Sequence, residues 1–184
     1  MMGHNNGPSM EPGVAWRTHC WRAARERLLP TLPIEVVRLR VRRAMELGLD
    51  YKTYASVRAS TGHDVVAFLF SSNALRVNLH VPVMPVARAA WIAGLKGCAA
   101  VGLATAPLAA SLLEAENPEL LRAEQAPWAL ARFGEIRGRM RTALGRLPAD
   151  QVILIGDHGL EQDWCAAGRL GAYLEAARYF PVAP

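Results

Sequence analysis

Residues 151–156, Gln-Val-Ile-Leu-Ile-Gly, are the stretch that decides the fold of this chain. The run is short, continuous and rich in β-branched residues, which is typical of a strand buried on both faces. A turn-forming segment, residues 148–150, precedes the run, and a polar segment, residues 157–159, follows it. The pattern therefore predicts a sheet that contains this strand, in a domain of the α+β or α/β class.

A second apolar run lies at residues 65–70, Val-Val-Ala-Phe-Leu-Phe, and the turn-forming residues 71–73 follow it. From Leu75 to Val83 apolar and polar residues alternate as in a strand with one buried face, and Pro82 would end that strand. This pattern favours a hairpin, so one or two strands are expected within residues 65–83. Residues 61–64 have the form of a capping box, and a helix over residues 62–71 is the alternative.

The rest of the chain is predicted to be mainly helical. The uncharged run at residues 97–113 is interpreted as two buried helices that meet near Pro107, whose ring cannot continue a helix. Its many Ala and Gly residues make it a poor membrane span. The helical spacing of apolar residues predicts helices over residues 15–29, 34–47, 51–59, 86–95, 106–114 and 118–122, a helix beginning at Pro127, and a last helix over residues 160–179.

Length and composition predict one domain. The chain has 184 residues, of which 52% are hydrophobic and 20% are charged, which is enough to bury a core. Residues 1–13 are rich in turn formers and are expected to be a disordered tail, so the globular domain is predicted to span residues 14–184. The three cysteines are widely spaced without a Cys-x-x-Cys pair, and no secretory signal precedes them, which favours a cytoplasmic protein.

The positive charge is concentrated near the N-terminus. The chain carries a net charge of +5, and residues 1–43 hold eight arginines and three glutamates, so this segment accounts for all of it. A localised basic segment points to an acidic partner, such as nucleic acid, and to the predicted helices over residues 15–29 and 34–47 as its binding face.

Residues 37–59 add a motif to this basic segment. Ala44 is followed four positions later by Gly48, which would end one helix, and Asp50 would cap the next. This spacing resembles the helix-turn-helix of many transcription regulators, in which a small residue and a turn glycine let two helices approach closely. The resemblance implies that DNA contacts would come from Arg38, Arg42 and Arg43 toward phosphates and from Lys52, Thr53, Ser56 and Arg58 toward bases. An ordinary helical hairpin with a solvated arginine face explains the same pattern.

A second candidate site follows the buried strand of residues 151–156. Asp157 and His158 stand where that strand ends, and ligands of open α/β sheets bind at the carboxyl ends of strands. An acid and an imidazole there suit acid/base chemistry, and Glu161, Asp163 and Cys165 could add metal ligands. Asp157 could equally cap the following helix. No spacing typical of a metal site completes this group, and the sequence does not identify a cofactor.

Two hypotheses for function follow. The first is a cytoplasmic binding or regulatory protein that engages an acidic partner through its arginine-rich N-terminal helices. The second is a small α/β enzyme or ligand-binding protein centred on Asp157 and His158, with Tyr51 or Asp64 as further contributors. A protein partner or a homo-oligomer that docks through the N-terminal segment is a third possibility, and no membrane partner is expected.

Overall fold

The structure, a computed structural model, describes residues 32–181. The chain divides into two units, residues 1–37 and residues 38–184. Of the first unit only residues 32–37 are described, and they include the beginning of helix α2 (Ile34–Glu46). The tail predicted over residues 1–13 and the helix predicted over residues 15–29 lie outside the described residues. The predicted domain boundary at residue 14 therefore stays a prediction.

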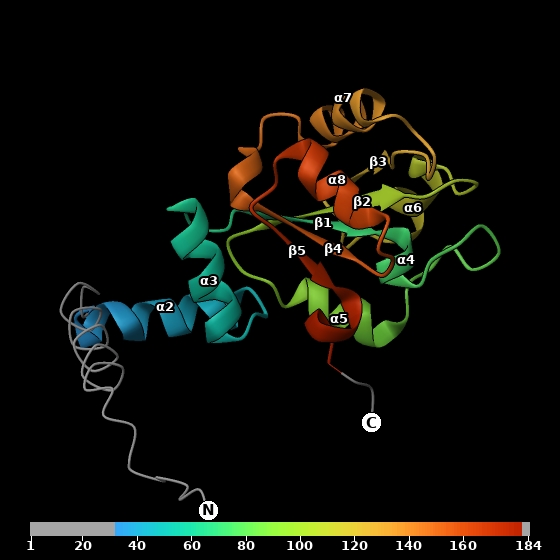
Figure 1. Ribbon diagram of the computed structural model, residues 1–184. Helices are drawn as coiled ribbons and strands as arrows, with labels where there is room; N and C mark the ends of the chain where they lie inside the picture. The colour runs from blue at the N-terminus through green and yellow to red at the C-terminus, as the bar shows by residue number, and fades with distance from the viewer. Residues whose placement is uncertain (1–31, 182–184) are drawn as a thin grey trace, which may run out of the picture. The chain divides into compact units, whose positions relative to one another are not determined.

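The second unit is built on a sheet of five parallel strands (Figure 1). The strand order across the sheet is β3-β2-β1-β4-β5, and Leu69 of the central strand pairs with Val101 on one side and Leu154 on the other. The α/β prediction is confirmed, with a larger sheet than the two or three strands expected. The strands are β1 (Ala67–Ser71), β2 (Ala99–Ala104), β3 (Arg122–Gln125), β4 (Val152–Gly156) and β5 (Ala172–Glu175).

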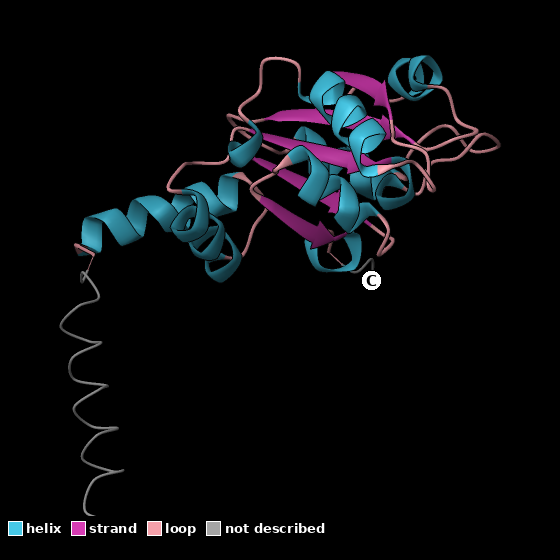
Figure 2. Cartoon of the chain, turned by 45° about the horizontal axis from the view of Figure 1, so that its top comes forward, coloured by secondary structure: helices cyan, strands magenta, loops and turns pink. Residues whose placement is uncertain are grey.

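Helices cover both faces of this sheet, which gives three layers (Figure 2). Helices α5 (Val86–Ala93), α6 (Ala110–Glu116) and α9 (Ala176–Tyr179) share a core with one face of the sheet, and α3 (Tyr51–Thr61) adds Tyr54 and Val57 to it. Helices α7 (Phe133–Leu144) and α8 (Glu161–Gly168) share a core with the other face. Short helices α4 (Ser72–Leu75) and η1 (Ala149–Gln151) complete the elements of the described chain.

The central strands follow the burial pattern expected of a covered parallel sheet. Phe68 and Phe70 of β1 enter one core, whereas Ala67 and Leu69 enter the other, and all four are fully buried. A strand with both faces covered has no polar face, so its sequence is continuously apolar. This is why residues 152–156 are recognisable as a strand from sequence alone.

The hairpin predicted within residues 65–83 is wrong, because β1 is parallel to both of its neighbours. The Ser71 hydroxyl accepts a hydrogen bond from the amide of Ala74 and so begins helix α4 where a hairpin turn was expected. Farther on, the Asn78 side chain accepts hydrogen bonds from the amides of His80 and Val81, and the alternating residues 79–83 form a loop. The alternative helix over residues 62–71 is also wrong, because Gly62 ends α3 with a φ of 77°.

Three further regions that were predicted to be helical contain strands. Residues 97–113 contain β2, whose Gly102 faces Leu113 and Leu120 so closely that a Cβ atom would overlap them. The small residues of this run therefore serve close packing on a strand and not helix contact. The predicted helix over residues 118–122 runs into β3, and the one over residues 160–179 is interrupted at Arg169, whose φ of 54° ends α8 before β5.

The connections between strands define a switch point in the sheet. The chain moves outward from β1 through β2 to β3, and then crosses back past β1 to β4 and outward again to β5. Loops at the carboxyl ends of β1 and β4 therefore leave toward opposite faces and open a crevice between them, which is where open α/β sheets bind ligands. Among the described residues, no helix has both the length and the apolar character needed to cross a membrane.

Candidate functional site at the carboxyl ends of the strands

The turns that follow β1 and β4 are joined by one buried carboxyl group. Glu161, the first residue of α8, is only 2% exposed. Its Oε1 atom accepts a hydrogen bond of 2.9 Å from the Asn73 amide of helix α4. Its Oε2 atom accepts bonds of 2.7 Å and 3.3 Å from the backbone N–H groups of Asp157 and His158. Glu161 therefore fixes the loop after β4 against the turn after β1.

Gly156 makes this arrangement possible at the end of β4. A Cβ atom on Gly156 would overlap the Glu161 carboxyl group and the ring of Tyr173. Asp157 was predicted as a possible cap of the following helix, but the N-cap position of α8 is Leu160, which makes no side-chain hydrogen bond to the helix. The loop amides of residues 157 and 158 are instead satisfied by Glu161, three to four residues later in the chain.

The carboxyl end of β2 is attached to the same region by two hydroxyl groups. Ser72 and Thr105 share a hydrogen bond between their side chains, and the Ser72 hydroxyl also accepts a bond of 3.1 Å from the Thr105 amide. Polar side chains from the ends of three neighbouring strands thus meet at one edge of the sheet. These side chains are far apart in the sequence, and no sequence motif contains them together.

A cavity of about 490 Å³ opens beside this polar edge. Its size is in the range of small-molecule sites, about 300–1,000 Å³. Most of its wall is apolar, and its polar groups come from the loops after β1, β2 and β4. The lining residues are Asn73, Thr105, Ala106, Pro127, Trp128, Ala129, Leu130, His158, Leu160, Glu161 and Trp164.

Tyr173 of β5 and Cys165 of α8 are held in their neutral forms. Burial, together with the negative charges of Glu161, Glu175 and Asp157, raises the pKa of Tyr173 to about 12, and its hydroxyl donates a 3.2 Å hydrogen bond to the carbonyl of His158. Burial raises the pKa of the Cys165 thiol to about 11. A thiol that stays protonated near neutral pH is a poor nucleophile, so Cys165 does not suit covalent catalysis.

The structure brings together only part of the site predicted after β4. His158 lines the cavity, whereas Asp157 is exposed beside it and is not among the lining residues. Tyr51 and Asp64 do not line it either. Among residues 32–181, no group of three His, Cys, Asp or Glu side chains is arranged to hold a metal ion, so Glu161, Asp163 and Cys165 form no such set with Asp157 and His158.

The predicted turn between α2 and α3 has the expected local geometry. Gly48 has a φ of 64°, and the Asp50 side chain accepts a hydrogen bond of 2.9 Å from the Thr53 amide and so caps α3. A Cβ atom on Gly48 would come within 2.9 Å of the Trp91 ring of α5. The turn therefore packs on the core of the sheet domain, and this packing gives its glycine a structural role that is independent of any ligand.

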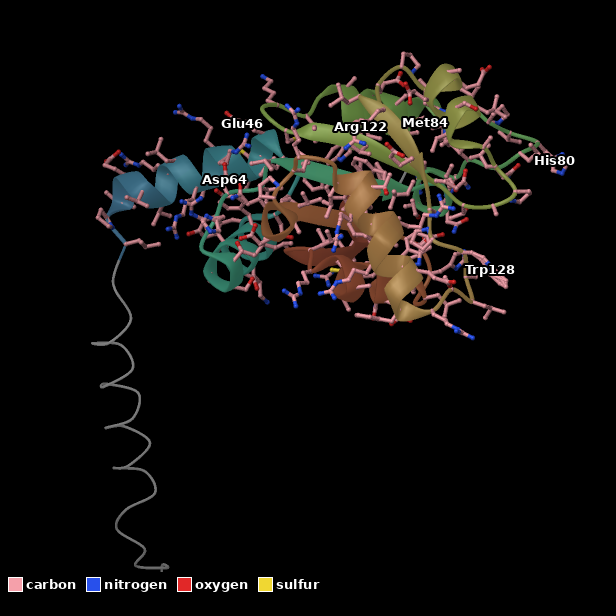
Figure 3. The ribbon with its side chains drawn as sticks, turned by 90° about the horizontal axis from the view of Figure 1, so that it is seen from above. Glu46, Asp64, His80, Met84, Arg122 and Trp128 are labelled. Carbon is pink, nitrogen blue, oxygen red and sulfur yellow. The ribbon has the colours of Figure 1, made fainter. Side chains whose placement is uncertain are left out.

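Arg43, which was predicted to contact phosphates, is instead bound within the protein. All five of its N–H donors have acceptors: the Asp64 and Glu46 carboxyl groups and the backbone carbonyls of Val65, Lys96 and Gly97. These carbonyls precede β1 and β2, so Arg43 ties the amino ends of two central strands. Figure 3 shows Glu46 and Asp64 at this end of the sheet, opposite Trp128.

The other residues of the DNA-binding hypothesis lie in different environments: some are exposed, and others contact carboxyl groups of the protein. Arg38, Arg42, Lys52 and Ser56 are exposed on α2 and α3. The Thr53 hydroxyl donates to Asp50, and the Arg58 guanidinium lies 3.9 Å from the Asp64 carboxyl group. The nucleic-acid or other acidic partner of these helices stays a prediction.

Sequence reasoning missed most of the cavity. Trp128 falls within the helix that was predicted to begin at Pro127, yet it lies in the loop before α7 and is 54% exposed. Asn73 and Thr105 each follow a buried strand by one or two residues, and a polar residue in that position is the signal that could have found them. Comparisons of the chain with protein-family models, with curated proteins and with solved structures found no match.

Proposed function

We propose that this protein binds a small organic molecule in the cavity at the carboxyl ends of β1, β2 and β4. The observation that carries the proposal is the position of the cavity at the switch point of the sheet, where the loops after β1 and β4 diverge. An apolar wall with a few convergent polar groups is the usual composition of a ligand site.

The polar groups are held in place before any ligand arrives. The Asn73 amide is bound to Glu161, and the Thr105 hydroxyl is bound to Ser72, so neither side chain must be ordered at the time of binding. Preorganised groups bind a ligand without a further loss of side-chain entropy. The rigid part of the site is therefore its floor, and the exposed side chains of Trp128, Leu130 and Leu160 form its rim.

His158 supplies an imidazole to the cavity wall, which could exchange a proton with a bound ligand. An imidazole is suited to acid/base catalysis near neutral pH. If the bound molecule is a substrate, His158→Asn would abolish turnover and leave binding within a few fold of the wild-type value. Asp157→Asn is the companion variant, and because Asp157 lies outside the lining its effect on binding is expected to be smaller.

A cavity-filling variant tests the proposal. Ala129 is exposed and lines the cavity, so Ala129→Trp would fill the space without disturbing the core. Ala59→Trp, at an exposed position on α3, is the matched control. A ligand-observed NMR screen of diverse small molecules should give hits that bind the wild type and Ala59→Trp but not Ala129→Trp. Hits that bind all three proteins equally, or no hits, would contradict the proposal.

A further inference from the structure

The cavity floor carries a buried acid that has no cationic partner. Glu161 accepts three N–H hydrogen bonds, but it forms no ion pair with any residue between 32 and 181. Among the described residues that line the cavity, none is Arg or Lys. A buried carboxylate without a cation leaves a negative potential in the space that it faces.

The same arrangement makes the site unsuitable for an anion. Backbone N–H groups at the end of a strand and the start of a helix commonly bind phosphate or carboxylate ligands. Here the N–H groups of Asp157 and His158 already donate to Glu161. An incoming anion would find those donors occupied and would meet the Glu161 charge at close range.

Two tryptophans line the cavity together with this acid. Trp164 is 4% exposed and belongs to the core on the α7 and α8 side of the sheet, whereas Trp128 is 54% exposed at the rim. The indole ring is the strongest cation–π partner among side chains, and aromatic rings recognise quaternary ammonium ligands. A carboxylate close to such rings adds Coulombic attraction for the same charge. Leu130 and Leu160 add apolar surface for the alkyl groups of such a ligand.

We infer that the ligand of this cavity is a small organic cation, such as an alkylammonium compound, with its charge near Glu161 and its alkyl groups against Trp128. This inference rests on the proposed function, because it names the class of molecule that the cavity takes. It requires no metal and no covalent step. The charge of the ligand and the indole of Trp128 each contribute to affinity, so the two contributions can be measured apart.

The test compares choline with 3,3-dimethylbutan-1-ol, in which a carbon atom replaces the charged nitrogen at nearly the same shape. Ligand-observed NMR titration of the wild type should show choline binding about tenfold more tightly than the neutral alcohol. Trp128→Ala should weaken choline binding about tenfold, and because Trp128 is exposed this variant is expected to fold. Leu121→Ala, at a 68% exposed position that does not line the cavity, is the control and should bind choline as the wild type does.

Glu161→Gln provides a second measurement, in which the preference for choline over the alcohol should fall toward unity. The inference would be overturned if the wild type bound the two probes with equal affinity. If Ala129→Trp also failed to bind both probes, the proposed function would still stand. Failure of choline to bind the wild type would also overturn the inference, and the screen with Ala129→Trp would then decide the proposed function separately. Choline binding that is insensitive to Trp128→Ala would place the cation elsewhere and contradict the inference.

Discussion

The two ends of the parallel sheet use their polar residues in opposite ways. At the amino end, the Arg43 guanidinium has an acceptor for each of its five N–H groups, and three of these acceptors are backbone carbonyls of residues shortly before β1 or β2. At the carboxyl end, Glu161 organises the loop after β4 and also borders an open cavity. Polar residues at the first end hold the sheet together, whereas those at the second end are arranged around a space.

This difference separates residues that stabilise from residues that are available to a ligand. Arg43 has an acceptor for every N–H group and an opposite charge beside it, so it has nothing left to offer a ligand, and its removal would leave acceptors unpaired. Exposed apolar rings at a cavity rim contribute little to folding and are available for binding. Changes at the amino end should therefore affect stability, and changes at the cavity rim should affect binding.

Replacing Arg43 by Met should have the largest effect on stability. The change removes the Arg43 donor from Asp64, Glu46 and three backbone carbonyls, and because one hydrogen bond to a charged group contributes about 1.5–3 kcal/mol, the total loss should be about 3 kcal/mol. The side chain of Arg43 is 20% exposed. Urea unfolding of Arg43→Met against Arg42→Met, at an exposed position next to it, measures the difference. A loss of the same size in both variants would contradict the structural role of Arg43.

Replacing Gly156 by Ala should have the second largest effect, at the opposite end of the sheet. The new methyl group would overlap the Glu161 carboxyl group and the Tyr173 ring, and such overpacking costs about 1–3 kcal/mol. Gly159→Ala, in the loop that follows β4, is the matched control, because a Cβ there has no atom within 4 Å. The account predicts lower stability and weaker ligand binding for Gly156→Ala alone, and equal behaviour of the two variants would be evidence against the close contact.

Asp64, which is bound to Arg43 and Tyr54 at the amino end of the sheet, should make the stability of the protein depend on pH below neutrality. Burial tends to raise the pKa of the Asp64 carboxyl, but hydrogen bonds from Tyr54 and Arg43 and the Arg43 charge outweigh it and hold the pKa below its ordinary value of 3.8. A lowered folded-state pKa stabilises the fold fully above that ordinary value, and the contribution is lost as pH falls below it. The stability difference between wild type and Asp64→Asn should therefore shrink in urea titrations as pH falls from about 6 to about 3. A difference that stays constant over this interval would exclude the ionised Asp64 as its source.

Replacing Trp128 by Ala should have the smallest effect on stability. An exposed side chain away from the core changes the free energy of unfolding by about 0.5 kcal/mol or less. Thermal unfolding without a ligand measures the stability of the variant, and unfolding with a ligand from the screen measures the rise in unfolding temperature on binding. Trp128→Ala should lose only this ligand-induced rise. A large loss of stability without ligand would show that Trp128 is a packing residue. It would contradict the proposed difference between the amino and carboxyl ends of the sheet.

The sequence predicts the elements that its local chemistry determines. Residues 152–156 are buried on both faces, so their apolar run identifies a strand without tertiary information. The turn at Gly48 and the cap at Asp50 depend on residues close in the chain, and both agree with the structure. The strand β2 was missed because its Ala and Gly residues are small for packing against α6 and β3, a tertiary reason that no local pattern contains.

The candidate site shows the same limit. Asp157 and His158 were both chosen because they follow a recognisable strand, but only His158 lines the cavity. Glu161 was treated as a possible metal ligand, but its role depends on Asn73, 88 residues away, which only the fold brings near. Arg43 was grouped with exposed arginines because its sequence neighbours are basic, and its five acceptors come from segments as far as residue 97.

Chemical-shift mapping of the ¹⁵N-labelled protein with a hit from the small-molecule screen tests the central claim most directly. The account predicts shifts in the backbone amides of Thr105 and His158, in the Asn73 side-chain amide and in the indole N–H of Trp128, with the amides around Arg43 and Asp64 unchanged. Shifts that gather instead at the amino end of the sheet, or on the exposed face of α2 and α3, would contradict the claim that the carboxyl end is the binding end.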